Sequence, residues 1–251
     1  MGSGQGHNSA RSAVTVAPEA QEFDEILYHI THDLRSALRA MKTLPGWLRE
    51  DLTSHGVTPT TSVLEILEMI ETQADRADRM LLDLRTFSRI GRASDDPSVM
   101  TLREAIDGAA EQVRIPAGFR IDCDLRVNAV RAPRNDLREL FAVLLSNAVT
   151  HHDADIGRIT IEAHTEDDAA ILSVTDDGPG IPERFRERVF SMMATLRPRD
   201  ECPGSGLGLS IARKIVTKMG GTVTIDDVGE GRGTRVRIAL PSSLVVAVAE
   251  S

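Results

Sequence analysis

Apolar residues recur at alternating steps of four and three between residues 23 and 48, which is the heptad spacing of an amphipathic helix. A second stripe of this kind runs between residues 66 and 87, and Gly56 and Pro59 mark a turn between the two. The first stripe consists of Phe23, Leu27, Ile30, Leu34, Ala37, Met41, Leu44 and Leu48, and the second of Ile66, Ile70, Gln73, Ala77, Met80, Leu84 and Phe87, widened by Val63, Leu67, Ala74 and Leu81. Two long helices joined by a short turn predict an antiparallel hairpin.

The apolar face of this hairpin is wider than two helices can bury between themselves. An exposed apolar surface of that extent favours association with another copy of the chain. Pairing two hairpins into a four-helix bundle would cover it. We therefore predict a homodimer formed through residues 23–90.

The pattern changes to a mixture of strand-like and helix-like segments after residues 92–98, whose sequence Arg-Ala-Ser-Asp-Asp-Pro-Ser is typical of a linker. Helices are expected near residues 102–113, 135–151 and 207–218, and strands near residues 119–125, 158–164, 170–175, 222–226 and 234–240. We predict a flexible arm over residues 1–20, the hairpin over 21–92, a linker over 93–98, a mixed α/β domain over 99–241 and a tail over 242–251.

The composition argues against several classes of protein. The 251-residue chain has 29 basic and 38 acidic residues, a formal net charge of −9 that disfavours broad electrostatic contact with nucleic acid or anionic lipid. Its two cysteines, Cys123 and Cys202, exclude a disulfide framework. The longest apolar run, residues 244–249, is far shorter than the roughly 18 residues of a membrane span. We expect a cytoplasmic protein with no membrane insertion and no nucleic-acid partner.

One histidine of the first helix, His32, points away from the apolar stripe and so is available to a partner. Ser36 lies one turn further along the same face. An ordinary surface histidine would show the same placement, so the helical pattern alone does not assign His32 a role.

Three polar or glycine-rich features lie in the α/β part. Asp176 ends a predicted strand in Asp-Asp-Gly-Pro-Gly, where a carboxylate can accept from an exocyclic amine, although the motif taken alone favours a plain turn. Gly204-Ser-Gly-Leu-Gly opens a helix, and free N–H groups at a helix N-terminus favour phosphate. Asn147, on a helix, is either a satisfied polar residue or an oxygen donor to a metal such as Mg²⁺.

The order of these motifs is more specific than any one of them. His32-Asp33-Leu34-Arg35, then Asn147, then Asp176-x-Gly-x-Gly, then Gly204-x-Gly-x-Gly resembles the sensor histidine kinases of two-component signalling. The resemblance extends over about residues 22–241. Residues 196–201, Leu-Arg-Pro-Arg-Asp-Glu, are most similar to the soluble, phytochrome-like branch.

The resemblance implies two domains. The hairpin would be the dimerisation and histidine phosphotransfer domain, a dimeric four-helix bundle. The α/β part would be an ATP-binding domain, a sandwich of a mixed sheet with helices on one face. The implied partners are a response regulator receiver domain, a second copy of the chain and a separate sensor protein.

The resemblance also implies residue roles. His32 would be the phosphoacceptor, Asp33 the acidic residue that assists it as a base, and Ser36 the polar position used in dephosphorylating the partner. The ATP and Mg²⁺ site would consist of Asn147 as metal ligand, Asp176 as adenine acceptor, Gly178, Gly180, Phe190, Gly204, Gly206 and Gly208, with Arg197 and Arg199 as cations of the lid.

Four positions depart from the family pattern. Ala37 stands where a proline is usual, Val143 where an asparagine is usual, Thr150 where a lysine is usual, and Met193 where a second aromatic residue is usual. The leading prediction is an ATP-dependent protein-histidine kinase that autophosphorylates His32 and passes the phosphoryl group to an aspartate. The alternative is a phosphotransfer or scaffold protein with a weakened ATP-binding domain. Chaperone, topoisomerase and mismatch-repair ATPases and serine-kinase anti-sigma factors share the ATP-binding fold, but the hairpin with His32 argues against them.

Overall fold

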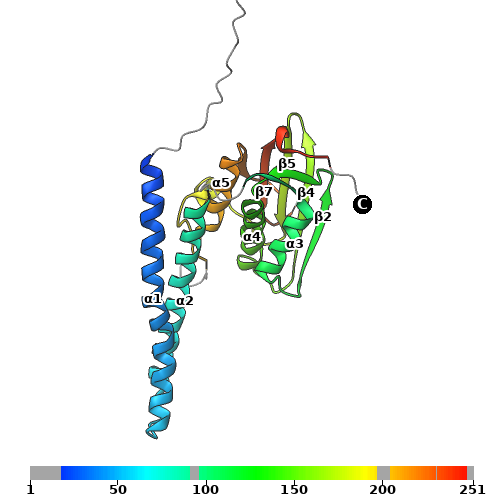
Figure 1. Cartoon of the computed structure of the whole chain (residues 1–251). Helices are drawn as coiled ribbons and strands as arrows, with labels where there is room; N and C mark the ends of the chain where they lie inside the picture. The colour runs from blue at the N-terminus through cyan, green and yellow to red at the C-terminus, as the bar shows by residue number, and fades with distance from the viewer. Residues whose placement is uncertain (1–17, 91–95, 197–203, 230, 248–251) are drawn as a thin grey trace, which may run out of the picture.

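The computed structural model describes residues 18–90, 96–196, 204–229 and 231–247, with side chains described from residue 30 onward. Within these ranges the chain forms a long helical hairpin followed by an α/β domain (Figure 1). This order confirms the fold class predicted from the sequence.

The hairpin consists of α1 (Pro18–Ser54) and α2 (Thr61–Arg89). The turn between them contains Gly56 in a left-handed conformation, with φ of +70°. The side chain of Thr60 then caps α2 by accepting from the backbone N–H of Val63. Helix α1 continues through Pro45.

Salt bridges fix the register of the two helices. Moving down α1, Arg35 pairs with Asp78 (3.4 Å), Lys42 with Asp75 (2.7 Å) and Arg49 with Glu71 (2.5 Å). The order of partners reverses on α2, as antiparallel helices require. On the same face of α2 as these partners, a heptad of buried residues completes the contact: Leu67, Ala74, Leu81 and Ser88.

The main apolar stripes do not lie in this contact. Ile30, Leu34, Met41, Leu44 and Leu48 on α1, and Ile66 and Ile70 on α2, are all exposed in the single chain. Among the stripe residues whose side chains are described, Leu67, Ala74 and Leu81, which the sequence pattern suggested as a widening of the second stripe, are buried. One hairpin therefore leaves most of its apolar surface uncovered.

The α/β domain is built on a five-stranded sheet of order β2-β4-β5-β7-β6. Its strands are β2 (Phe119–Leu125), β4 (Gly157–Glu166), β5 (Ala169–Asp176), β6 (Thr222–Asp226) and β7 (Arg235–Pro241). β2 pairs parallel to β4, and the other neighbours are antiparallel. Helices α3 (Leu102–Val113), α4 (Arg134–Thr150) and α5 (Gly208–Lys218) lie on one face of the sheet (Figure 1).

Two short strands were not predicted. β1 (Ser98–Thr101) and β3 (Ala129–Ala132) form a separate antiparallel pair beside the main sheet. β1 begins at Ser98, the last residue of the predicted linker. Strands of four residues are too short for an alternating pattern to be visible in the sequence. The connections of the domain also contain the 3₁₀ turns η1 (Glu183–Phe185), η2 (Arg188–Phe190) and η3 (Ser242–Leu244).

The core lies between the sheet and the three helices. Helix α4 contributes a broad buried face that includes Leu137, Phe141 and Leu145. β5, in the middle of the sheet, is buried continuously from residue 170 to 174. This packing holds the last turn of α4 and the end of β5 at one end of the domain, where both face the same cavity.

The hairpin and the α/β domain touch along α2 and α5. The Nζ atom of Lys214 on α5 donates to the carbonyl oxygen of Phe87 on α2 at 2.7 Å and lies 4.2 Å from the centre of the Phe87 ring. This contact places α2 against the side of the α/β domain that carries the cavity.

Candidate functional site

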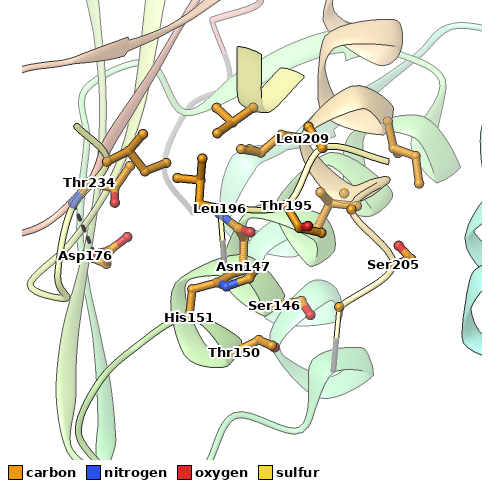
Figure 2. A pocket seen from close by; sticks show the side chains of 18 of the residues that line it. Ser146, Asn147, Thr150, His151, Asp176, Thr195, Leu196, Ser205, Leu209 and Thr234 are labelled. Carbon is orange, nitrogen blue, oxygen red and sulfur yellow. Dashed lines mark hydrogen bonds between the residues drawn. The ribbon is translucent and has the colours of Figure 1, made fainter. Parts of the chain in front are cut away.

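A cavity of about 670 Å³ lies among α4, the loop after β5, residues 194–196 and the Gly-rich segment 204–208. Figure 2 shows Asp176 and Ser205 at opposite ends of this pocket, with Asn147 between them. A cavity of this size is suited to a ligand as large as a nucleotide. It gathers Asn147, Asp176, Gly180 and the three glycines of segment 204–208, which the sequence predicted as one site.

Asp176 is the last residue of β5 and is about half-buried at one end of the pocket. Its Oδ1 atom accepts from the backbone N–H groups of Gly178 (2.9 Å) and Thr234 (3.1 Å). Burial raises the pKa of the Asp176 carboxyl above its ordinary value, while the two backbone hydrogen bonds and His152 partly oppose that shift. The result is an acceptor held in a fixed direction, as recognition of an amine donor requires.

Helix α4 forms the floor of the pocket. Glu139, Val143, Asn147 and Thr150 follow one another at steps of four, four and three, so they share one helical face, and all four line the cavity. Glu139 was not predicted as a site residue, although its spacing from Asn147 would have identified it.

The Gly-rich segment forms the other end of the pocket and leads into the first turn of α5. Gly206 has φ of +74°, and a Cβ atom there would lie 2.9 Å from the carbonyl oxygen of Ala194. Only glycine fits both conditions. Gly204, Gly206 and Gly208 all line the cavity, so the backbone at the start of an eleven-residue helix borders it, where unpaired N–H groups favour an anion.

One wall of the cavity comes from the hairpin. Asp83 on α2 lines the pocket, and its Oδ2 atom accepts from the hydroxyl of Ser205 at 2.5 Å. Burial raises the pKa of Asp83 despite this bond. Burial also raises the pKa of Glu139, and Asp83 adds to that shift, so two carboxyls that resist ionisation stand at this end of the pocket. The sequence gives no local sign of Asp83, because only the docking of the two domains brings it here.

The oxygen donors of the pocket fit a hard cation. Within the described ranges, no three His, Cys, Asp or Glu side chains gather into a metal site made by protein alone. Mg²⁺ bound with a polyphosphate needs only one or two protein oxygens. The Asn147 amide and the Glu139 carboxyl lie on one face of α4 and border the cavity, and they supply oxygens of that kind.

His32, Asp33 and Ser36 lie elsewhere, on α1, and none of them lines the pocket. The side chain of His32 is 75% exposed, which agrees with its predicted position away from the apolar stripe. Its Nδ1 atom lies 3.2 Å from Oδ1 of Asp33. Asp33 and Ser36 are also exposed.

Phe190 does not line the pocket either. Its side chain is buried in the core, and the guanidinium of Arg213 on α5 lies 4.2 Å from the ring centre. Its neighbours Phe185 and Val189 line the cavity instead. The sequence could not separate these apolar residues, since all lie within two short 3₁₀ turns. Gly178 touches the site through its bond to Asp176, while Arg197 and Arg199 fall outside the described residues.

Two family models match the chain in succession. Residues 24–93 match the His Kinase A (phospho-acceptor) domain, and residues 132–244 match the histidine kinase-, DNA gyrase B- and HSP90-like ATPase. The methanogenesis regulatory histidine kinase FilI of Methanothrix harundinacea is 30% identical over 226 residues, which is 88% of this chain and 25% of FilI. The chain thus spans about a quarter of the length of that relative.

Solved structures agree with the architecture. The mycobacterial sensor histidine kinase MprB aligns with a TM-score of 0.51 at 29% identity, over 58% of this chain and 97% of that one. The histidine kinase ThkA in complex with the response regulator protein TrrA aligns with a TM-score of 0.58 at 22% identity, over 89% of this chain and 64% of that one, which supports the fold. In the part of the chain described here, no helix is long and apolar enough to cross a membrane.

Proposed function

Since the chain belongs to the sensor histidine kinases, we propose that it is an ATP-dependent protein-histidine kinase that autophosphorylates His32 and passes the phosphoryl group to an aspartate of a response regulator. The observation that carries this proposal is the pocket. A fixed carboxylate at one end, glycine N–H groups at the other and an amide between them match the needs of adenine, phosphates and a cation.

Different residues of the pocket bind different parts of the nucleotide. The Asp176 carboxylate accepts from the exocyclic amine of adenine, and the backbone at Gly204–Gly208 binds the phosphates. Asn147 would hold Mg²⁺, with Glu139 on the same face of α4. When bound, the cation neutralises charge on the phosphates.

The contact between His32 and Asp33 prepares the nucleophile. With the Nδ1–H group donating to the Asp33 carboxylate, the lone pair of Nε2 is left to attack the γ-phosphorus. The new N–P bond forms as the bond from phosphorus to the β,γ-bridging oxygen breaks, and ADP leaves. The Nδ1 proton stays on the ring, where Asp33 stabilises the positive charge that develops.

The second substrate is a receiver aspartate. Its carboxylate attacks the phosphorus of phosphohistidine, and the imidazole leaves. Ser36, exposed one turn beyond His32, is placed on the face that such a partner approaches, where it takes part in dephosphorylation. The complex of ThkA with TrrA is the parallel that supports a response regulator as partner.

The uncovered apolar stripes support a homodimer. Leu44 and Ile66 are each 53% exposed and lie on different helices of the hairpin. A second copy of the hairpin would cover both stripes in a four-helix bundle. Because His32 lies outside the pocket, transfer requires the ATP-binding domain to move along the hairpin or to act on the partner copy. The stimulus would come from a separate sensor protein or a further segment.

The second candidate is a phosphotransfer or scaffold protein with a weakened ATP site. Val143 favours it, because its Cγ1 atom lies 3.4 Å from the position of a Cβ on Gly208 and so places a methyl group beside the phosphate end of the pocket. Thr150 adds no positive charge there.

Titration of ATP with Mg²⁺ into the full chain separates the two candidates. A kinase binds ATP with a dissociation constant in the micromolar range and then labels itself from γ-labelled ATP. Absence of measurable binding would contradict the kinase and favour the scaffold.

A further inference from the structure

His152 follows the last turn of α4, and the site described above does not use it. Its side chain is only 4% exposed, which is unusual for a histidine at the end of a surface helix. It contacts the turn at residues 176–178 through Asp177, and it is not among the residues that line the nucleotide pocket.

Both ring nitrogens of His152 are engaged by the protein. Nε2 lies 3.1 Å from Oδ1 of Asp177, and Nδ1 lies 3.0 Å from the backbone nitrogen of Ala154. A carboxylate can only accept, so Nε2 carries a proton and donates to Asp177. Nδ1 lies 3.0 Å from both the backbone nitrogen and the carbonyl oxygen of Ala154, which engage it as donor and as acceptor. These contacts leave neither nitrogen for a metal ion.

The space around the ring is shaped to receive it. The edge of Phe119 meets the imidazole at an interplanar angle of 84°, with the ring centres 5.2 Å apart. A Cβ atom on Gly157 would lie 3.0 Å from Nε2, and one on Gly178 would lie 3.3 Å from Cδ2 of the ring. The imidazole therefore fills the gap between the start of β4 and the turn that follows β5.

The contacts connect three elements at the base of Asp176. Oδ1 of Asp177 accepts both from His152 and from the backbone N–H of Arg158 at 2.8 Å. Asp177 is thus tied to the end of α4 and to the start of β4 at once. Its chain neighbour is Asp176, whose carboxylate must point into the pocket.

A second tie comes from the other side of the same turn. Arg232 donates through Nε to the carbonyl oxygen of Gly178 at 3.1 Å and through Nη2 to Asp153. Residues 152 and 153 therefore hold the turn directly and through Arg232, while Asp176 receives its own bonds from Gly178 and Thr234.

We propose that His152 is a positioning residue for nucleotide recognition: by donating from Nε2 to Asp177, it holds the 176–178 turn so that Asp176 meets the exocyclic amine of adenine. This role rests on the proposed function. Its signature is base selectivity, because a misplaced Asp176 loses its preference for adenine over a base with a carbonyl in place of the amine.

The test is calorimetric titration of the full chain with ADP and with inosine diphosphate, both with Mg²⁺. In His152→Phe, which keeps an aromatic ring but cannot donate, ADP affinity should fall about tenfold and the preference for ADP over inosine diphosphate should shrink, because the turn that orients Asp176 loses its hydrogen bond from His152. In His152→Gln, whose amide can donate to Asp177, much of the preference should return. His164→Gln on β4, an exposed site, is the control and should match the parent.

A second variant covers the case in which His152→Phe does not fold. Asp177→Ala removes the acceptor from an exposed residue and should lower ADP affinity and selectivity in the same way. Parent-like selectivity in a folded His152→Phe, or an effect of Asp177→Ala alone, would overturn the role of His152. A parent that binds neither nucleotide would instead overturn the proposed function, so the two failures are distinguishable.

Discussion

Asp176 illustrates how a functional residue opposes stability. Its burial raises the pKa of the carboxyl, which means that the ionised form costs folding free energy. The backbone N–H groups of Gly178 and Thr234 offset part of that cost. The protein keeps the carboxylate because a neutral side chain at this place would accept from adenine less strongly.

Replacing Asp176 with Asn should separate binding from folding. The amide oxygen of Asn can still accept from both backbone groups, so the thermal midpoint of the nucleotide-free protein should stay the same or rise. Nucleotide binding should weaken by about 1.5–3 kcal/mol, the value of a hydrogen bond to a charged group. Scanning calorimetry and ATP titration measure the two effects. An unchanged ATP affinity would refute the assignment of Asp176.

The raised pKa of Asp176 also determines how stability and nucleotide binding change with pH. Because the pKa of Asp176 is raised in the folded protein, its contribution to stability is fully present below the unfolded pKa and is lost as pH rises through the folded pKa. Nucleotide binding follows the opposite trend and should weaken as pH falls, beginning above the ordinary range of an aspartate. In Asp176→Asn, this loss of nucleotide affinity at low pH should disappear.

Val143 and Thr150 are expected to slow the kinase. Both line the pocket on the face of α4 that carries Asn147, but neither supplies a positive charge, and Val143 has no oxygen to offer a cation. The double variant Val143→Asn with Thr150→Lys should label His32 roughly tenfold faster at saturating ATP, which corresponds to about 1.4 kcal/mol in the barrier. An initial rate no faster than that of the parent would show that the departures are neutral.

At the scale of elements, periodicity predicted the long segments well and the short ones poorly. Both hairpin helices, the three helices of the α/β domain and the five strands of the main sheet appear close to their expected ranges. β1 and β3 were missed because four residues carry no detectable period. The heptads also could not show which apolar positions face the second helix, since the salt bridges of Arg35, Lys42 and Arg49 set that geometry.

The exposed stripe of α2 gives a prediction about assembly. Ile66→Glu places a charge on this stripe and should shift the protein from dimer toward monomer, because the charge would be buried in the bundle without a partner. Light scattering at micromolar concentration measures the mass. Thr72→Glu, exposed on another face of α2, is the matched control and should remain dimeric. A monomeric parent would contradict the dimer.

At the scale of the whole molecule, the site is only partly visible in the sequence. Asn147, Asp176 and the glycines carry local motifs, so their convergence was predicted. Asp83 carries none, because it reaches the pocket from α2 through domain docking. Phe190 lies in the core and does not line the cavity, and the sequence does not distinguish these two positions, because both take apolar residues.

The bond between Asp83 and Ser205 predicts that docking of α2 on the α/β domain competes with nucleotide binding. Asp83 occupies the hydroxyl of Ser205 within the segment that binds phosphates, and the ionised fraction of its carboxyl repels them. Asp83→Asn in the full chain should therefore tighten ATP binding by roughly fivefold, about 1 kcal/mol. Glu68→Gln also removes one negative charge from α2, at an exposed residue, and is the control. Equal or weaker binding in Asp83→Asn would contradict this role.

The most direct test of the proposed activity is labelling of the full chain with γ-labelled ATP and Mg²⁺. The parent and the control His55→Gln, which changes another exposed histidine of the hairpin, should acquire a label that is lost in acid and retained in base, as phosphohistidine requires. The variant His32→Gln should acquire none. A label that persists in His32→Gln, or a parent that binds ATP but never becomes labelled, would contradict a kinase acting on His32.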